Sequence, residues 1–289
     1  MVLRIAMLIY FCLCQWSALA NVTLTARAGV SYERQEYINN VLVAALNANQ
    51  LNGKIVSVTP IPTRIGYNAS TFLVAKNEVD VTYFPADKEV EKSLSAIRIP
   101  LYKGLMGYRT LLIRKTSQKE FAQLSSLDEL KALLKGTGTR WKSTQVYDFH
   151  EFDYVTADRM SSLYKMLDVG KFDYTSRGVI EAVADLKAIK NRFTSLKIED
   201  NILLYTELPI YFFVAQNKPE LAEKIYLGLL KIIENGQFDT LFSKFYATIP
   251  AELNLKSRKI YHVENPFLSK ETLENAQTFW QQKIKKPAF

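Results

Sequence analysis

Residues 97–113 decide how the chain is organised, because they form one long extended stretch, Ile-Arg-Ile-Pro-Leu-Tyr-Lys-Gly-Leu-Met-Gly-Tyr-Arg-Thr-Leu-Leu-Ile. A single strand of this length is unusual, since strands usually have about 5–6 residues. Gly104 and Gly107 allow the backbone to bend within the stretch. We therefore expect the chain to leave one lobe here and to enter another.

A second extended stretch, residues 202–214, contains Pro209 and predicts the return crossing. Around the crossings, segments rich in alternating apolar residues are followed by segments with helical periodicity. Strands are predicted at residues 22–28, 54–60, 78–83, 153–156 and 170–174, and helices at 33–49, 70–76, 126–134, 159–169, 178–189 and 219–235. This alternation predicts an α/β fold with mostly parallel, helix-covered sheets.

The two crossings divide the chain into two α/β lobes. The first lobe is discontinuous and comprises residues 21–105 and 210–289, and the second comprises residues 106–209. We expect the two extended connections to act as a hinge and the space between the lobes to form a cleft for a small molecule.

Residues 1–20 have the pattern of a secretory signal peptide. Arg4 precedes ten apolar residues, and the segment ends in Ala18-Leu19-Ala20, the small-residue pattern of a cleavage site. The apolar run is shorter than the ~20 residues needed to span a bilayer. We expect export to the periplasm with cleavage after Ala20; an N-terminal anchor or a buried strand is the alternative interpretation.

Composition and charge argue against several classes of chemistry. The chain has two cysteines, both within the predicted signal peptide, and two histidines outside any metal-ligand spacing, so we expect neither a metal nor another cofactor. The formal charge is +8, and seven basic but only three acidic residues fall in 256–289. This concentration indicates a solvated tail rather than a basic and aromatic face, so no nucleic-acid partner is expected.

Several segments, in this order, resemble the type II periplasmic solute-binding proteins of the amino-acid-binding family 3. The matching segments are residues 78–81, 99–109, 127–130, 136–139, 170–174, 208–214 and 217–222. The resemblance implies a two-lobed, periplasmic-binding-protein-like type II fold with two hinge crossings. It also implies a small-molecule ligand, a membrane permease or a sensor as partner, and a monomer without catalytic activity.

Within this family, the chain resembles a branch in which Trp follows the Gly-rich turn and Arg-Gly follows a late strand, here Trp141 and Arg177-Gly178. It departs from that branch at two places. Lys142 stands where the branch often has an acidic residue, and Thr175-Ser176 stands where it often has Phe-Pro. The identity of the ligand therefore does not follow from the resemblance.

The candidate ligand-binding residues are cations, a hydroxyl and aromatic rings. Arg98, at the first crossing, and Arg177 could each hold a carboxylate through two parallel hydrogen bonds. Thr139, at a helix start, could hold carboxylate oxygens. The rings of Tyr83, Tyr102 and Trp141 could stack on a ligand. A surface ion pair or helix cap for each arginine, a plain capped turn for Thr139, and core or hinge packing for each ring are equally consistent interpretations.

The preferred function is therefore capture of a small polar solute, an amino-acid-like molecule or an organic anion, for transport or sensing. One alternative is an enzyme on the same scaffold that resembles cyclohexadienyl dehydratases, for which Glu181 and Glu207 are candidate general acids. Another is a sensory module that kept the fold and lost transport. Fold alone does not decide among them.

Overall fold

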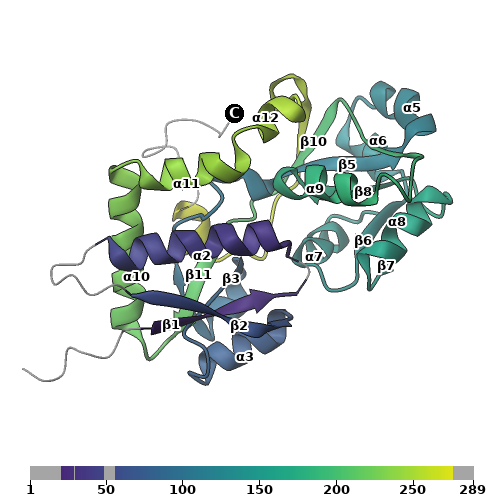
Figure 1. Ribbon diagram of the computed structural model, residues 1–289. Helices are drawn as coiled ribbons and strands as arrows, with labels where there is room; N and C mark the ends of the chain where they lie inside the picture. Colours follow the sequence, from purple (N-terminus) through teal and green to yellow (C-terminus); the bar gives the residue numbers. More distant parts are fainter. Residues whose placement is uncertain (1–20, 29, 49–55, 276–289) are drawn as a thin grey trace, which may run out of the picture. The chain divides into compact units, whose positions relative to one another are not determined.

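The computed structural model describes residues 21–28, 30–48 and 56–275 and divides them into two units, each with its own packed elements (Figure 1). The first unit comprises residues 21–83, 93–97 and 213–241, and the second comprises 84–92, 98–212 and 242–275. The predicted signal peptide, residues 1–20, lies outside the described residues. No helix in the described part of the chain is long and apolar enough to cross a membrane.

The first sheet has the strand order β2-β1-β3-β11-β4, and β1 pairs in parallel with both of its neighbours. Its strands are β1 (Asn21–Arg27), β2 (Ser57–Ile65), β3 (Val81–Pro85), β4 (Leu94–Ile97) and β11 (Ile210–Ala215). The helices α2 (Tyr32–Asn47) and α3 (Tyr67–Ala75) are drawn on opposite sides of β1 and β2 in Figure 1. The predicted β-α-β-α-β order at the start of the chain is confirmed.

Helix α10 (Pro219–Glu234) packs closely on α2, and one glycine makes this possible. A Cβ at Gly228 would lie 1.9 Å from the carbonyl oxygen of Ala45, so any side chain there would force the helices apart. Pro219 occupies the first turn of α10, where its missing N–H costs nothing. The predicted helix over 219–235 is confirmed.

The prediction for the second strand was wrong in its bounds. The sequence predicts a strand over 54–60, whereas β2 runs on to Ile65 through Pro60 and Pro62. Because β2 is an edge strand, its outer side has no partner that would need the missing N–H groups of the prolines.

The second sheet has the strand order β12-β10-β5-β8-β6-β7, with β9 also paired to β5. Its strands are β5 (Tyr108–Arg114), β6 (Lys135–Gly138), β7 (Tyr154–Ala157), β8 (Tyr174–Gly178), β9 (Leu196–Ile198), β10 (Ile202–Tyr205) and β12 (Lys259–His262). β5 runs antiparallel to β8, β9 and β10, while β6 runs parallel to β7 and β8.

Alternation along β5 gives the second unit a separate apolar core on each face of its sheet. Leu111 and Ile113 enter one core, to which α5 (Gln118–Gln123), α6 (Leu127–Lys131) and α7 (Lys142–Phe149) contribute. Leu112 enters the other core, to which α8 (Met160–Asp168) and α9 (Val179–Ile189) contribute.

The prediction that residues 97–113 do not form a single strand is confirmed. β4 ends at Ile97, Gly104 has a φ of 79°, and a 3₁₀ turn η1 (Leu105–Gly107) leads into β5. At Gly107 a Cβ would lie 2.7 Å from the carbonyl oxygen of Thr206. Gly104 adopts the left-handed backbone conformation, and Gly107 leaves space for the carbonyl group of Thr206. Both glycines therefore allow the bend.

The predicted assignment of all of 210–289 to the first lobe differs from the observed division. The chain from Phe242 to the last described residue groups with the second unit, together with residues 84–92 and 98–105. One reason is that β12 pairs in parallel with β10. The elements near the C-terminus are α11 (Gln237–Tyr246), which crosses the division between the two units, α12 (Ile249–Glu252) and η3 (Leu255–Ser257). The second unit also contains the short helices α4 (Lys88–Glu91) and η2 (Lys115–Ser117).

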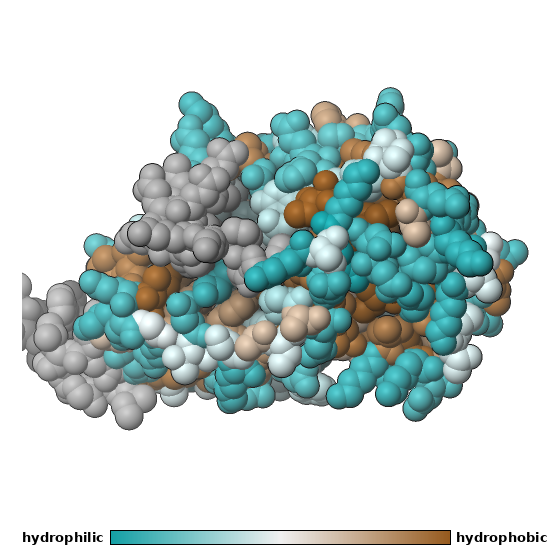
Figure 2. All heavy atoms as spheres, turned by 90° about the horizontal axis from the view of Figure 1, so that it is seen from above, coloured by the Kyte–Doolittle hydropathy of each residue, from teal (hydrophilic) through white to brown (hydrophobic). Residues whose placement is uncertain are grey.

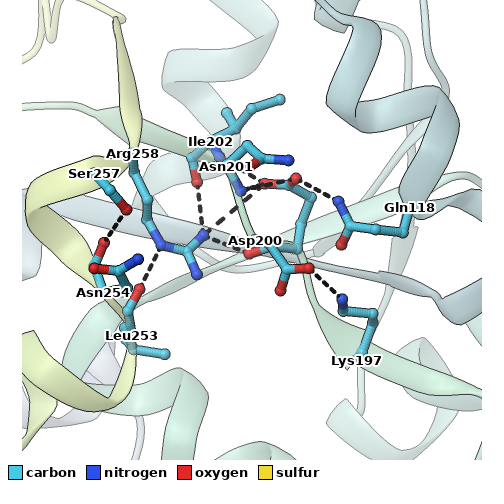
Figure 3. A network of polar contacts seen from close by, with 10 residues as sticks. Gln118, Lys197, Asp200, Asn201, Ile202, Leu253, Asn254, Ser257 and Arg258 are labelled. Atoms are coloured by element: carbon cyan, nitrogen blue, oxygen red, sulfur yellow. Dashed lines mark hydrogen bonds and ion pairs between the residues drawn. The ribbon is translucent and has the colours of Figure 1, made fainter.

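A buried polar network also fastens the C-terminal segment to the second unit (Figure 3). Glu199 is fully buried and accepts hydrogen bonds from Gln118 Nε2 and from the backbone N–H groups of Asn201 and Ile202. Arg258 donates to the carbonyl oxygens of Leu253, Glu199 and Ile202. The contact between Arg258 and Glu199 could not be predicted from the sequence, because the two residues are far apart in the chain.

Candidate functional site

The strands of the second sheet bring a set of polar residues to one edge. The C-terminal ends of β6, β8 and β10 lie at the same edge as the N-terminal end of β5, since β5 is antiparallel to β8 and β10. Arg109 is opposite Gly178 on one side and Leu204 on the other. Ligands of open α/β sheets bind outside the carboxyl ends of the strands, so this edge is the candidate site.

Arg177, one of the predicted site residues, is buried at this edge and has two carboxylate partners. Its Nε donates to Asp185 Oδ2 at 2.6 Å, and its Nη1 lies 3.3 Å from Glu181 Oε2. The guanidinium also lies over the ring of Trp141, 4.8 Å from the ring centroid. The structure therefore brings two predicted residues, Arg177 and Trp141, into direct contact.

The charge of Arg177 is balanced within the second unit. Burial disfavours the charged guanidinium, but the carboxylates of Glu181 and Asp185 outweigh burial and raise the pKa of Arg177. Glu181 Oε2 also accepts from the backbone N–H of Gly178, which caps α9. This cluster is built as a structural ion pair, and Arg177 already has acceptors for the bonds that a ligand carboxylate would need.

The Gly-rich turn after β6 is shaped by the ring of Trp141. A Cβ at Gly138 would lie 2.4 Å from the indole, so only glycine lets the ring fold back on the strand end. Thr139, also predicted, is exposed in this turn and its N–H donates to the carbonyl oxygen of Ala157. Thr137 is buried and shares a hydrogen bond with Thr144, with 2.8 Å between the hydroxyl oxygens.

Arg109 lies on the opposite face of the sheet and was not among the predicted residues. Only 3% of the residue is exposed, and its Nη2 donates to the carbonyl oxygen of Ser176 at 3.1 Å. Its Nε is buried and has no hydrogen-bond partner. No carboxylate of the described residues pairs with this guanidinium, in contrast to Arg177.

Lys135, at the start of β6, is a second buried cation on the same face. Its Nζ donates to Ser176 Oγ at 2.9 Å and lies 4.0 Å and 4.5 Å from the ring centroids of Tyr147 and Tyr174. Burial and, after it, the charge of Arg109 hold the pKa of Lys135 well below its usual range. The environment therefore disfavours the charged form of this amine, and an anion bound nearby would favour it.

Three side-chain atoms near this strand end are buried and have no hydrogen-bond partner: Arg109 Nε, Thr110 Oγ1 and Thr206 Oγ1. Thr110 follows Arg109 on β5, and the N–H of Thr206 donates to the carbonyl oxygen of Gly107 just before β5. Buried polar atoms left unpaired cost about 1–3 kcal/mol each. Arg109 and Thr110 are consecutive on β5 and therefore point to opposite faces of the sheet, so a polar ligand on the face of Arg109 could satisfy Arg109 Nε but not Thr110 Oγ1.

The remaining predicted residues have other partners. Arg98 Nη2 lies 2.5 Å from Glu91 Oε2, and its Nε donates to Thr272 Oγ1. Tyr102 is buried with its ring tilted against Tyr246. Tyr83 belongs to the first unit, where it is buried and its hydroxyl donates to Gln35 Oε1 at 2.7 Å. A role in ligand binding for these residues, and for Thr139, Trp141 and Arg177, stays a prediction.

The departure at Lys142 has a structural explanation. Its Nζ lies 2.9 Å from Oδ2 of Asp87, which also accepts from Gln145 Nε2. Burial opposes ionisation of Asp87, but the hydrogen bonds from Gln145 and Lys142 outweigh burial and lower its pKa. Lys142, at the position where the resembled branch often has an acidic residue, therefore pairs with a buried carboxylate of the same unit.

Glu207, a candidate acid in the enzyme hypothesis, follows β10 at the same edge. Burial and the charge of Glu264 raise its pKa, while His262 opposes the shift. The other candidate acid, Glu181, is the partner of Arg177. No group of three or more His, Cys, Asp or Glu side chains in residues 21–28, 30–48 and 56–275 could hold a metal ion.

Fold and edge together define a mixed α/β protein of two sheets with the type II periplasmic-binding-protein fold, as the sequence resemblance predicted. No protein-family model and no curated protein matches the chain. Solved structures do match, and they include amino-acid-binding proteins of this fold and a sensor domain.

An ancestral arginine-binding protein bound to arginine is 17% identical, covers 78% of this chain and 98% of its own, and has a TM-score of 0.59. A putative binding component of an ABC transporter from Wolinella succinogenes, complexed with lysine, is 14% identical and covers 78% and 96%, with a TM-score of 0.59. A histidine kinase sensor domain with similarity to periplasmic binding proteins is 13% identical and covers 78% and 96%, with a TM-score of 0.57. At these identities the likeness establishes the fold alone.

Proposed function

We propose that this protein is an exported solute-binding protein that captures a small amino-acid-like molecule or organic anion at the strand-end edge of its second unit. The observation that carries the proposal is Arg109, a buried guanidinium without a carboxylate among the described residues. An uncompensated buried charge costs several kcal/mol. The carboxylate of a ligand would neutralise it and accept from its Nε.

The chemistry of the surroundings favours an anionic group over a cationic one. Lys135 and Arg109 both present nitrogen to this face of the sheet, and the acceptors that they use are the neutral hydroxyl and carbonyl of Ser176. An ammonium group here would meet like charge, whereas a carboxylate would meet two donors. Arg109, Lys135 and Ser176 all belong to the second unit, so an anion held by them needs no residue of the first unit.

The test is a panel of ligands read by thermal unfolding of the mature protein. The panel contains the twenty L-amino acids and small carboxylic acids, and we expect at least one to stabilise the protein by about 2.7 kcal/mol at a hundred times its Kd. Arg109→Met should weaken that binding about 100-fold, because charge-assisted hydrogen bonds contribute about 1.5–3 kcal/mol.

The matched control is Arg192→Met, which removes an exposed arginine of the same unit that lies over Phe193. It should bind as the unaltered protein does. If no member of the panel stabilises the protein, or if Arg109→Met binds normally, the proposal fails.

The partner in this proposal is a membrane permease or a sensor, and the protein acts as a monomer. The two roles differ in what the protein captures from a detergent-solubilised membrane. A permease identifies transport, and a membrane protein without transporter subunits identifies sensing, as the resemblance to a kinase sensor domain would suggest.

An enzyme on this scaffold is the second candidate, and the raised pKa of Glu207 favours it. A half-buried carboxyl whose pKa is raised by burial and by the charge of Glu264 suits a general acid in a dehydratase reaction. The test is to incubate the protein with prephenate and with arogenate and to analyse the products. A product that forms with the unaltered protein but not with Glu207→Gln would support the enzyme hypothesis. Absence of product with the unaltered protein would rule it out.

A further inference from the structure

Three segments of the second unit meet at the edge of its sheet that lies opposite the candidate site. Arg114 ends β5, so it lies roughly 17 Å along the strand from Arg109. The N–H of Lys115 donates to the carbonyl oxygen of Ser195 at 2.7 Å, and Ser195 Oγ donates to Asp168 Oδ1. These contacts form one corner of the unit, which we call the far corner and which comprises residues 114–115, 165–171 and 190–195.

The far corner has exposed basic residues on each of its three segments. They are Lys115 after β5, Lys165 and Lys171 at and after the end of α8, and Lys190 and Arg192 after α9. All five are exposed, and none has an ion-pair partner among the residues that the structure describes. Figure 2 shows many hydrophilic side chains, in teal, on the side where Figure 1 draws α5 and α8.

The carboxylates at the far corner are already engaged by the fold. Asp168 is the only acidic residue in the sequence of the three segments, and it accepts from Ser195 Oγ. Asp173, close by, accepts from the backbone N–H of Leu134 at 2.9 Å, and its Oδ1 lies 3.6 Å from Arg114 Nη2. The charge of the five exposed cations is therefore not paired within the corner, and it can attract an anionic partner.

A structural role explains only some of the cations here. Arg114 has one, because its Nη1 donates to the carbonyl oxygens of Leu167 and Phe172. Lys165 lies in the last turn of α8, where the helix dipole stabilises positive charge. Lys115 and Lys171 lie outside both α8 and α9 and have no such role.

The arrangement of the corner favours an extended anionic surface over a small anion. A small anion needs donors that converge on one point, whereas these cations come from three segments and are each exposed. Val169 lies between Lys165 and Lys171 in the sequence and is 60% exposed, in a turn that Gly170 closes with a φ of 74°. Basic residues around an exposed apolar one are typical of surfaces that bind lipid headgroups.

We propose that the far corner binds the surface of a membrane that contains anionic phospholipids. The headgroup phosphates pair with the five cations, and Val169 contacts the boundary between headgroups and acyl chains. The inference goes beyond the proposed function, because it uses no residue of the candidate site and needs no bound solute. Arg109 lies at the opposite end of β5, so the candidate site stays open while the protein is on the membrane.

The experiment is cosedimentation of the protein, purified after export, with vesicles of phosphatidylcholine alone or mixed equally with phosphatidylglycerol. We expect binding to the mixed vesicles to be at least about 10-fold stronger than to phosphatidylcholine. Raising sodium chloride from about 0.05 M to about 0.5 M should abolish the difference, because salt screens exposed charges. Equal binding to both vesicles, or no binding to either, would overturn the proposal.

A pair of triple variants separates the far corner from the net positive charge of the chain. Lys115→Gln, Lys171→Gln and Lys190→Gln together remove one charge from each segment and should weaken binding about 100-fold, or about fivefold for each charge. The control triple removes three exposed lysines elsewhere, in Lys76→Gln, Lys231→Gln and Lys256→Gln. It should bind within about threefold of the unaltered protein, and equal losses in both triples would contradict a specific surface.

Acetylation of lysines, read by mass spectrometry, locates the contact directly. Mixed vesicles should slow the acetylation of Lys115, Lys171 and Lys190 and leave Lys231 unchanged. If soluble polyglutamate protects the three lysines and the vesicles do not, the partner is an acidic protein and the lipid proposal fails. Thermal unfolding of the first triple variant should match that of the unaltered protein, because its substitutions are all exposed.

Discussion

Two buried arginines on neighbouring strands of the second sheet are treated in opposite ways. Arg177 on β8 lies between Glu181 and Asp185 and against the ring of Trp141. Arg109 on β5 has only the carbonyl oxygen of Ser176 as acceptor, and its Nε has none. The two residues occupy opposite faces of one sheet at one edge.

The difference shows why residue type and position in a motif do not establish a binding role. A guanidinium with two carboxylates has its charge and donors engaged by the fold. A guanidinium buried with neutral acceptors keeps a charge that an incoming anion can neutralise. Of the two, the arginine outside the predicted site has the chemistry that a ligand carboxylate requires.

The largest effect is expected where the Arg177 cluster is broken. Changing Glu181→Gln and Asp185→Asn together retains shape and acceptors but removes both negative charges, which leaves Arg177 buried without compensation. The free energy of unfolding should fall by about 3–5 kcal/mol, measured by urea denaturation. Adding Arg177→Met should recover most of the loss, because the uncompensated charge is then gone.

The control for this change is an ion pair of the same unit that is exposed. Lys197 Nζ lies 2.6 Å from Asp200 Oδ2, but the Asp200 side chain is 59% exposed. Asp200→Asn should cost no more than about 1 kcal/mol. If the double variant costs as little as this control, Arg177 is not held by its carboxylates in the way described.

A smaller effect of opposite sign is expected at Lys135. The folded-state pKa of this lysine lies below its unfolded value, so the unfolded chain binds more protons in the pH range between the two. Stability therefore rises with pH through that range and is reduced below it. Lys135→Met should stabilise the protein by about 1–3 kcal/mol near neutral pH and flatten this dependence, as measured by denaturation between pH 6 and 10.

Lys131 is the matched control, because its Nζ lies 5.8 Å from the Phe152 ring centroid, as does Nζ of Lys135. Lys131 is only partly buried, whereas Lys135 is fully buried. Lys131→Met should give none of the stabilisation expected for Lys135→Met. A Lys135→Met variant that is destabilised at neutral pH would contradict a lysine whose charged form is disfavoured by its burial.

Most of the fold was predictable because it depends on short-range patterns. The strand and helix order at the start of the chain, the bend at Gly104 and the first turn of α10 follow from alternation, glycine and proline. The position of the C-terminal segment was not predictable, because it depends on long-range pairing of β12 with β10 and on the contacts of Glu199 with its neighbours. Neither contact has a local signal.

The candidate site was predictable only in part. Trp141 and Arg177 do meet, but their partners Glu181 and Asp185 become visible only once α9 is placed on the sheet. Arg109 has a local signal in the sequence, because it is in phase with Leu111 and Ile113 and this places a cation on the core face of β5. Lys135 had none, since a four-residue strand is too short to show which way its first residue points.

The smallest expected effect is the uptake of a proton on ligand binding. It distinguishes a ligand held by Arg109 from one held near Arg177. Burial and, after it, the charge of Arg109 depress the pKa of Lys135. An anion held by Arg109 offsets that charge, so binding of an anionic ligand should raise the pKa of Lys135. Less than one proton should then be taken up per ligand at a pH between the pKa values of Lys135 in the free and the ligand-bound protein, and affinity should increase as the pH falls.

Calorimetric titration of the stabilising ligand in buffers of different ionisation enthalpy measures this uptake. Lys135→Met should abolish it and Lys131→Met should retain it. A ligand held instead near Arg177, whose charge is already balanced and which has no depressed amine beside it, would bind with the same uptake in all three proteins.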